Sequence, residues 1–337
     1  MRTVLLRLTL AVAASAALVV TAFPAPAGAK VPGPNGRIVF LRPDPAIGDM
    51  VTYTVNPDGS HLQQLFPGGV GEPPHWSPDS SLVAIDSQFA CPTAGFNCDL
   101  AVIVNPDTGS FRELKNPNPI INDFFCTVWS PDATRLACDG TSDTDPSLNG
   151  IYTIRSSDGG DLTRITANVP PGGADRPVDY SPDGKSLVFI QLDSNEQASL
   201  FVVKVKGGVP KQITTPPEMV LGLFSASWSP SGNKVLFGAR SDPDHRGAIW
   251  VVNSDGTGLH QVGIPSCGGA FSNRTSVSCF DPGWSPDGTK IVFGRFDPTN
   301  GRRDIYTANA DGSGLSQVTH SGLGDSWPDW GPHPLTG

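Results

Sequence analysis

A short motif, Trp-Ser-Pro-Asp-Gly, recurs along the chain with small variations and constrains the fold more than any other feature. Each copy begins at an aromatic residue, and successive copies start 46 to 56 residues apart. A catalytic serine occurs once in an active site, whereas a structural turn can recur wherever a fold repeats itself, so this spacing indicates an array of similar units. The aromatic anchors are Trp76, Trp129, Tyr180, Trp228, Trp284 and, in a degenerate copy followed by Gly-Pro, Trp330.

Each unit has three short apolar runs after its anchor and a fourth that leads into the next anchor. After Trp284 the runs are 290–295, 305–309 and 317–319, and an Asp-Gly turn separates the last two. Short apolar runs that alternate with Gly-rich turns, without an amphipathic helical pattern, are typical of all-β proteins. Four strands in about 50 residues is the layout of a propeller blade. We therefore expect an all-β, six-bladed β-propeller of four-stranded antiparallel blades.

The anchor itself predicts a tight turn. Proline presets the backbone for a type I turn, and the serine hydroxyl can bond nearby backbone N–H groups. The aromatic residue before it would end the innermost strand of a blade and bury its ring against the neighbouring blade. A hydrolase whose nucleophilic serine sits at a strained elbow needs a helix after that serine. Because Pro286 and then a strand follow Ser285, we expect a structural role for this serine.

The two ends of the array predict how the ring closes. Residues 36–41 look like the strand that follows an anchor, yet no anchor precedes them, and Trp330 is an anchor with no strands after it. Joining the ends completes a sixth blade, with its inner strand from the C-terminal end and its outer three strands from residues 37–66. Such an exchange leaves no free sheet edge between the first and last blades.

The N-terminal segment has the pattern of an export signal. Arg2 and Arg7 precede an apolar run at 8–23, and Ala25–Ala29 then offers small-x-small cleavage sites. The apolar run is short for a bilayer span of about 20 residues. We expect the mature protein to be secreted or held in the cell envelope, with no membrane span after cleavage. The expected divisions are a signal peptide (1–29), a short linker (30–35) and a single propeller domain (36–333).

Six cysteines lie as three close pairs, and export makes disulfides the expected state. A zinc site is the alternative, but no pair has the Cys-x-x-Cys spacing and no histidine lies within four residues of any of them. The middle pair flanks the Trp129 turn, so we expect it to join adjacent strands of one hairpin. The pairs are Cys91 with Cys98, Cys126 with Cys138, and Cys267 with Cys279.

The charge balance is acidic. The formal net charge is −9, and removal of the signal peptide with its two arginines would make it −11. No cluster of lysines and arginines interrupts this balance, which argues against nucleic acid or anionic lipid as a partner.

The residues leading into the anchors include many acids, and inner strands line the central channel of a propeller. Several carboxylates facing a narrow channel would attract a divalent cation, Ca²⁺ above all, or a basic peptide segment. The alternative is that these acids cap turns or face solvent at the ends of the blades. The candidate residues at the channel mouth are Glu72, His75, Asp123, Asp175, Arg176, Asp179, Asp281, Asp325 and Asp329.

The repeat unit resembles that of the C-terminal six-bladed propeller of TolB and its WD-like relatives. The resemblance rests on Trp-Ser-Pro-Asp-Gly-x-x-Ile-x-Phe, then Ile-Tyr or Ile-Trp, an Asp-Gly turn and a Val-Thr strand, and it covers almost the whole mature chain. TolB also has an N-terminal α/β domain, for which the expected mature chain has no equivalent. Because many unrelated functions share such propellers, the resemblance implies a fold and leaves the function open.

Two functional hypotheses follow from these features. The first is a monomeric, non-catalytic module, without a required cofactor, that binds a protein or glycan partner through its loop faces or channel mouth. The second is an extracellular hydrolase or lyase that acts on carbohydrate or peptide inside the channel. His75 and the channel carboxylates are then the candidate participants, because only His75 among the six histidines directly precedes an anchor.

Overall fold

The structure is a computed structural model. It describes residues 32–335 apart from 67, 88–99, 119, 122, 168–172, 194–196, 215–224, 241–245 and 270–275. The predicted signal peptide and the Cys91–Cys98 pair lie outside the described residues.

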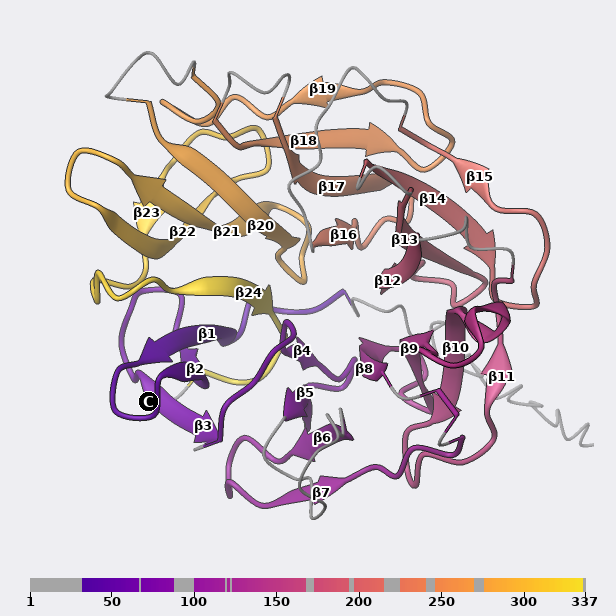
Figure 1. The fold of residues 1–337 in the computed structure, drawn as a ribbon. Helices are drawn as coiled ribbons and strands as arrows, with labels where there is room; N and C mark the ends of the chain where they lie inside the picture. Colours follow the sequence, from indigo (N-terminus) through magenta and orange to yellow (C-terminus); the bar gives the residue numbers. More distant parts are fainter. Residues whose placement is uncertain are drawn as a thin grey trace, which may run out of the picture.

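Six four-stranded antiparallel sheets form a ring, which confirms the predicted six-bladed propeller (Figure 1). Within each blade the strands follow one another from the channel outwards, and blade 1 alone takes its innermost strand from the C-terminal end. Blades 1 to 3 comprise, in this order, β24 (Ser326–Trp330), β1 (Ile38–Asp44), β2 (Asp49–Val55) and β3 (Gln63–Phe66); β4 (His75–Trp76), β5 (Val83–Ser87), β6 (Leu100–Val104) and β7 (Phe111–Glu113); and β8 (Asp123–Trp129), β9 (Arg135–Thr141), β10 (Gly150–Arg155) and β11 (Thr163–Arg164). Blades 4 to 6 comprise β12 (Ala174–Tyr180), β13 (Ser186–Leu192), β14 (Ala198–Lys204) and β15 (Lys211–Gln212); β16 (Ala226–Trp228), β17 (Lys234–Ala239), β18 (Ala248–Asn253) and β19 (His260–Gln261); and β20 (Ser278–Trp284), β21 (Lys290–Asp297), β22 (Arg302–Asn309) and β23 (Ser316–Gln317).

The predicted closure of the ring is confirmed. β24 pairs antiparallel with β1, and Ile38 lies opposite Trp330. The indole N–H of Trp330 donates to the carbonyl of Gly36 at 2.8 Å. Trp330 also packs in one cluster with Val292 and Ile305 of blade 6, so the two ends of the chain complete a blade that is packed against its neighbour.

Apolar packing between neighbouring blades forms the core. The second strand of four blades carries a phenylalanine at the same position, and each of these rings is fully buried. Burying one such side chain contributes about 1.5–3 kcal/mol, so the repeat places a comparable contribution in each of those blades. These residues are Phe40, Phe189, Phe237 and Phe293.

The anchors form hydrogen-bonded turns at one end of the ring, as predicted. In the copy that begins at Trp284, the Ser285 hydroxyl donates to Asp287 at 2.7 Å and accepts from the backbone N–H of Lys290 at 2.9 Å. The Gly288 N–H closes the turn on the Ser285 carbonyl at 2.9 Å. We call this end of the ring the anchor face. The opposite end, where each second strand turns into the third and each blade leads into the next, is the loop face.

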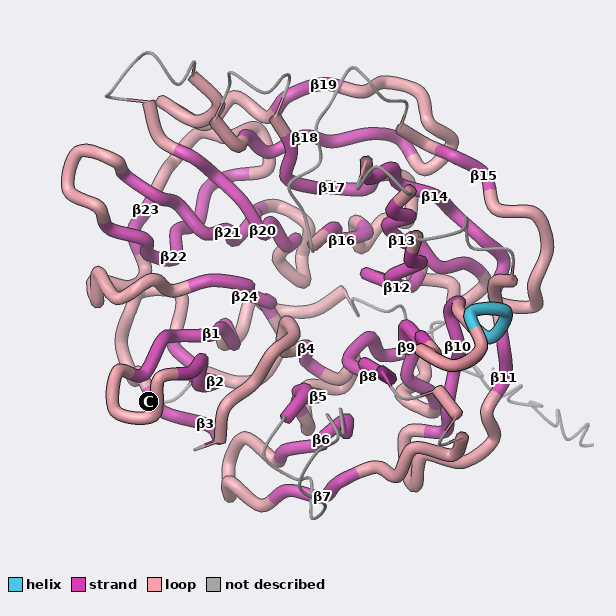
Figure 2. The backbone as a smooth tube through the Cα atoms, viewed as in Figure 1, coloured by secondary structure: helices cyan, strands magenta, loops and turns pink. Residues whose placement is uncertain are grey.

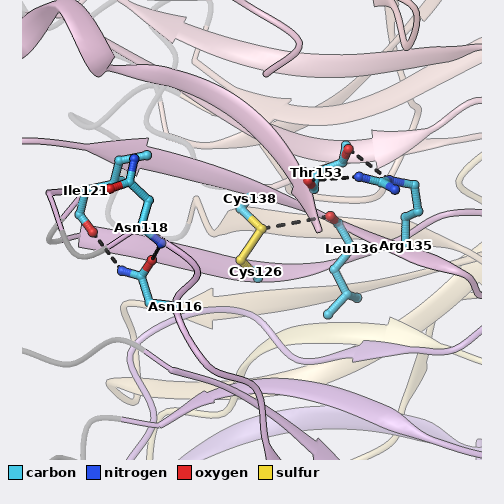
Figure 3. Close-up of a disulfide and its surroundings, with 8 residues drawn as sticks. All are labelled: Asn116, Asn118, Ile121, Cys126, Arg135, Leu136, Cys138 and Thr153. Atoms are coloured by element: carbon cyan, nitrogen blue, oxygen red, sulfur yellow. Dashed lines mark hydrogen bonds between the residues drawn. A yellow bond between two sulfur atoms is a disulfide. The ribbon is translucent and has the colours of Figure 1, made fainter. Parts of the chain in front are cut away.

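Two disulfides lie within the described residues. Cys126 of β8 and Cys138 of β9 join the two inner strands of blade 3, which confirms the predicted hairpin link (Figure 3). Cys138 holds the position that phenylalanine occupies in four other blades. The second disulfide joins Cys267, in the loop before β20, to Cys279 near the start of that strand.

Helical structure is limited to one 3₁₀ turn, Pro146–Leu148, among the residues described (Figure 2). Over the same residues, no helix combines the length and the apolar character needed to cross a bilayer.

Candidate functional site

The inner strands enclose a central channel with a pocket at each end. The loop-face pocket has a volume of about 520 Å³ and the anchor-face pocket about 610 Å³, in both cases counting space open to solvent. His75, Val128, Val178 and Pro328 line both pockets and therefore mark the middle of the channel.

The carboxylates of the anchor-face pocket join neighbouring blades. Asp179 precedes the anchor of blade 4 and accepts from the backbone N–H of Trp228, the anchor of blade 5, at 2.7 Å. Asp329 of blade 1 accepts in the same way from the N–H of Trp76 in blade 2, at 2.9 Å. The residue directly before an anchor is thus an inter-blade hydrogen-bonding position in these two blades.

The loop-face pocket contains a mixed-charge group that we call the mouth cluster: Glu72, Asp139 and Arg176. These side chains come from three successive blades or their connections, since Glu72 leads into blade 2, Asp139 lies on β9 and Arg176 on β12. The guanidinium is 3.4 Å from Asp139 (Nε to Oδ2) and 3.6 Å from Glu72 (Nη1 to Oε1). The side chains of Glu72 and Arg176 keep 17% and 23% of their exposure, against 8% for Asp139.

Burial is the main influence on the electrostatics of the mouth cluster. It raises the pKa of Asp139 to about 7, although the charge of Arg176 lowers this pKa; the charge of Glu72 raises it further. Arg176 and Glu72 thus act in opposite directions on the pKa of Asp139, and burial outweighs both.

A tryptophan completes the wall of the loop-face pocket. Trp327 of β24 is half-buried and lines the pocket with Pro328. Its backbone and indole N–H groups hydrogen-bond Asp281 of β20, whose pKa burial raises to about 6 against the opposing influence of Arg303 at 3.3 Å. Arg303 in turn stacks over the Phe280 ring at 3.9 Å. Blade 6 thereby fixes the position of an aromatic side chain in blade 1.

The structure brings together some of the predicted channel residues and separates others. Glu72, His75, Arg176, Asp179 and Asp329 line the two pockets. The remaining three described acids are buried among protein groups: Asp175 accepts from Gln191 at 2.8 Å, Asp281 is held by Trp327 and Arg303, and Asp325 accepts two bonds from Arg42 at 2.7 and 2.8 Å. The side chain of Asp123 lies outside the described residues.

Asp139 and Trp327 are pocket residues that sequence reasoning missed. Asp139 is the polar end of an apolar run otherwise assigned to a buried strand, and Trp327 stands three residues before an anchor tryptophan. A charged residue ending a buried strand, and a second tryptophan on an inner strand, were the available signals.

The described residues contain neither a metal-ligand group nor an exposed anchor serine. No three His, Cys, Asp or Glu side chains within the described ranges are grouped so that they could hold a metal ion. Ser285 is fully buried and engaged in its turn, and the same hydroxyl-to-carboxylate bond occurs at Ser77, Ser130 and Ser181. The loop-face pocket has an apolar wall with a few charged groups, a composition shared by binding sites and active sites.

Fold and channel together define a six-bladed β-propeller that is structurally similar to TolB. No protein-family model matches the chain. TolB of Acinetobacter baumannii superimposes with a TM-score of 0.64 at 16% identity, over 89% of this chain and 67% of that protein, and the likeness therefore concerns the fold.

Two curated proteins are similar in sequence. The uncharacterized protein Atu1656 of Agrobacterium fabrum is 28% identical over 230 residues, which are 66% of this chain and 69% of that protein. The uncharacterized peptidase YuxL of Bacillus subtilis is 26% identical over 212 residues, which are 53% of this chain. The match spans only 31% of the length of YuxL.

Proposed function

We propose that the protein is an exported, non-catalytic binding module that takes a segment of a partner polypeptide into its loop-face pocket. The observation that carries this proposal is the make-up of that pocket. Its wall contains four prolines and a half-buried tryptophan, and charged groups lie at its mouth. A rigid apolar wall loses little conformational freedom on binding, and tryptophan and arginine often dominate the energy of protein interfaces. The prolines are Pro73, Pro74, Pro177 and Pro328.

The Cys126–Cys138 and Cys267–Cys279 disulfides support the location that the proposal requires. Such bonds form and persist in secreted and extracytoplasmic proteins, because cytosolic reductants keep thiols reduced. The N-terminal sequence pattern points the same way.

We do not propose a hydrolase or lyase site in this channel, because several candidate side chains already have structural hydrogen bonds. The anchor serines are engaged in turns, and Asp179 and Asp329 are engaged in joints between blades. The peptidase name of YuxL belongs to a protein of which this match covers less than a third.

The test is selection of random linear peptides, displayed on phage, against the immobilised protein. We expect selected peptides to lose binding to Arg176→Ala and Trp327→Ala. Arg155→Ala is the matched control, because Arg155 is exposed and pairs with Asp158 within its own turn. Binding to an oligosaccharide array, with no peptide selected, would indicate a glycan partner. Turnover of peptide or polysaccharide substrates, abolished by His75→Ala, would show that the channel is catalytic and would overturn the proposal.

A further inference from the structure

We propose that Asp281 positions Trp327 in the loop-face pocket and makes this pocket sensitive to pH: the ionised carboxylate holds the indole in the wall, and protonation releases it. This inference rests on the proposed function and adds the regulation of the same site. Trp327 lines the pocket, whereas Asp281 acts from behind it on strand β20, so Asp281 is a positioning residue.

The first argument is the backbone at the joint between blades 6 and 1. Strand β20 has a bulge at Asp281 and Pro282, and β24, which packs against it, has one at Trp327 and Pro328. Asp281 and Trp327 have φ of 51° and 49°, and no other described residue of the six inner strands has a positive φ. The left-handed region is disfavoured for a residue with a side chain, and a residue before proline is biased toward extended backbone. Such backbone persists only where other contacts hold it, and it is frequent at functional sites.

The second argument is the contact that holds this backbone. The Asp281 carboxylate is 5% exposed and accepts hydrogen bonds from the backbone N–H and the indole N–H of Trp327. Hydrogen bonds to an ionised acceptor are roughly twice as strong as those between neutral groups. A protonated carboxyl also turns one of its oxygens into a donor. The ionised form therefore offsets the unfavourable backbone of Trp327 better than the neutral form does. Loss of the charge should let Trp327 return to extended backbone and move its indole out of the wall.

The direction of the pH effect follows from the pKa of Asp281. Burial raises this pKa to about 6, while the charge of Arg303 and the two hydrogen bonds from Trp327 oppose the rise. Asp281 is therefore mostly ionised at pH 7.5 and mostly protonated at pH 5. Trp327 should be held at the higher pH and released at the lower, so affinity for a partner should fall as pH decreases through about 6.

The charged groups around Asp281 come from several strands. Arg303 of β22 lies 3.3 Å away (Nη2 to Oδ2), and its own pKa is influenced by Asp325, which pairs with Arg42 of β1. Strands β16 and β18, which pack against β20 from blade 5, carry no charged side chain. The other packed strands are β17, β21 and β24, and none of their charged residues is among the groups that shift the pKa of Asp281. These residues are Lys234, Lys290, Arg295, Asp297 and Asp329.

The first test follows the indole ¹⁵N–¹H resonance of Trp327 in the protein without a partner, assigned by its loss in Trp327→Phe. TEMPOL, a small neutral paramagnetic probe, broadens the resonances of groups that reach solvent. We expect the resonance to move with a midpoint near pH 6 and to be broadened more strongly at pH 5 than at pH 7.5. Asp281→Asn should remove this pH dependence and leave the indole accessible at both values.

Two further variants identify the group that titrates. Arg303→Gln removes the cation that lowers the pKa of Asp281, so the midpoint should move to higher pH. Asp139→Asn removes another buried carboxylate, which lines the loop-face pocket, and is the matched control. It should keep the midpoint near pH 6.

The second test connects the position of Trp327 to binding. A displayed peptide that requires Trp327 should bind about tenfold more weakly at pH 5 than at pH 7.5, because about a tenth of Asp281 is ionised one unit below its pKa. In Asp281→Asn the same peptide should bind weakly at both pH values.

A Trp327 resonance that does not respond near pH 6, an equal response in Asp281→Asn, or an unchanged midpoint in Arg303→Gln would overturn the inference. If displayed peptides bind with the same affinity at both pH values, the binding module stands and its regulation by Asp281 falls. If the indole responds as expected but no displayed peptide binds, the proposed function falls, and the pH-sensitive contact between Asp281 and Trp327 remains.

Discussion

The fourth residue of each of the five anchor turns has a left-handed backbone conformation, whether or not it is glycine. Three copies have glycine at the fourth turn position, with φ of 68° to 78° at Gly184, Gly232 and Gly288. Ser80 and Ala133 hold the same position with φ of 59° and 58°. A side chain is disfavoured there, because Cβ crowds the backbone in the left-handed region. The turns of blades 2 and 3 are thus more strained than those of blades 4 to 6.

Replacing Ala133 by glycine should therefore stabilise the protein. Relief of the left-handed strain should exceed the extra freedom that glycine gives the unfolded chain, for a net gain of about 0.5–1 kcal/mol in the free energy of unfolding. Urea denaturation measures the difference. The reciprocal variant, Gly288→Ala, should lose about 1 kcal/mol in the free energy of unfolding. Its Cβ would meet only Pro230, at an ordinary contact distance of 3.5 Å, so the loss would come from the left-handed backbone and not from a clash. A loss of stability in Ala133→Gly would contradict this account.

Asp139 should make stability depend on pH in the direction opposite to most carboxylates. Its folded pKa of about 7 lies above the ordinary value of 3.8, so the folded state holds a proton that the unfolded chain releases. This contribution to stability is fully present below about pH 4 and is lost as pH rises through 7. In Asp139→Asn the melting temperature should fall less between pH 5 and pH 8 than in the unsubstituted protein. Parallel melting profiles would refute this role of Asp139.

At the scale of strands, the sequence predicted the positions of the strands better than it predicted the face to which each side chain points. The second strand of blade 6 begins at Lys290, as expected from its apolar residues and the preceding turn, and ends at Asp297, two residues beyond the expected end. Register shifts in β20, between Phe280 and Gly283, and in β12, between Pro177 and Asp179, are not visible in the apolar pattern. A bulge changes the face to which nearby side chains point, because strand side chains alternate with a period of two.

Some of the predicted channel acids lie away from the pockets because of these register shifts and because they bond residues far away in the sequence. Asp281 lies within the shifted part of β20, with φ of 51°, and is bonded to Trp327 of another blade. Asp325 pairs with Arg42, 283 positions earlier in the chain. Nothing local identifies either partner, so sequence could nominate these acids but could not place them. Asp179 and Asp329 are adjacent to anchors, and their pocket positions were predictable from the repeat alone.

The hydrogen bonds that link neighbouring blades give a prediction about stability. Asp179→Ala removes the acceptor for the backbone N–H of Trp228 and should destabilise the protein by about 1–3 kcal/mol. Asp179→Asn keeps a side-chain oxygen and should lose much less. Denaturant unfolding of both variants compares the two cases. Equal losses would indicate that the negative charge, and not the hydrogen bond, supports the joint.

At the scale of the molecule, closure of the ring is the feature that sequence predicted most completely. The sequence has an anchor without following strands at one end and strands without an anchor at the other, which predicts that the two ends pair in one blade. The pairing of β24 with β1 confirms this prediction. The likeness of the fold to the TolB propeller was likewise visible in the repeat. The pocket chemistry was not, because a pocket depends on how six blades converge and each repeat describes only one blade.

Deleting residues 326–337 should therefore prevent cooperative folding. The deletion removes β24, the inner strand of blade 1, and exposes the edge of β1 together with buried Ile38. An open edge and an uncovered apolar face favour aggregation. Calorimetry should show no single sharp transition. A deletion of only residues 334–337 keeps Trp330 and His333 and should melt like the full chain; a cooperative transition in the longer deletion would show that closure is dispensable.

Both described ends of the chain lie at the anchor face. Asn35 bonds Asp287 in the last anchor turn at 3.0 Å, and His333 bonds the Ser80 carbonyl in the first at 2.7 Å. A tether attached to either terminus would therefore hold the propeller by its base and leave the mouth cluster facing outward. Sensor chips, display scaffolds and fused reporters can all use these attachment points without obstructing the opening through which we expect a ligand to enter.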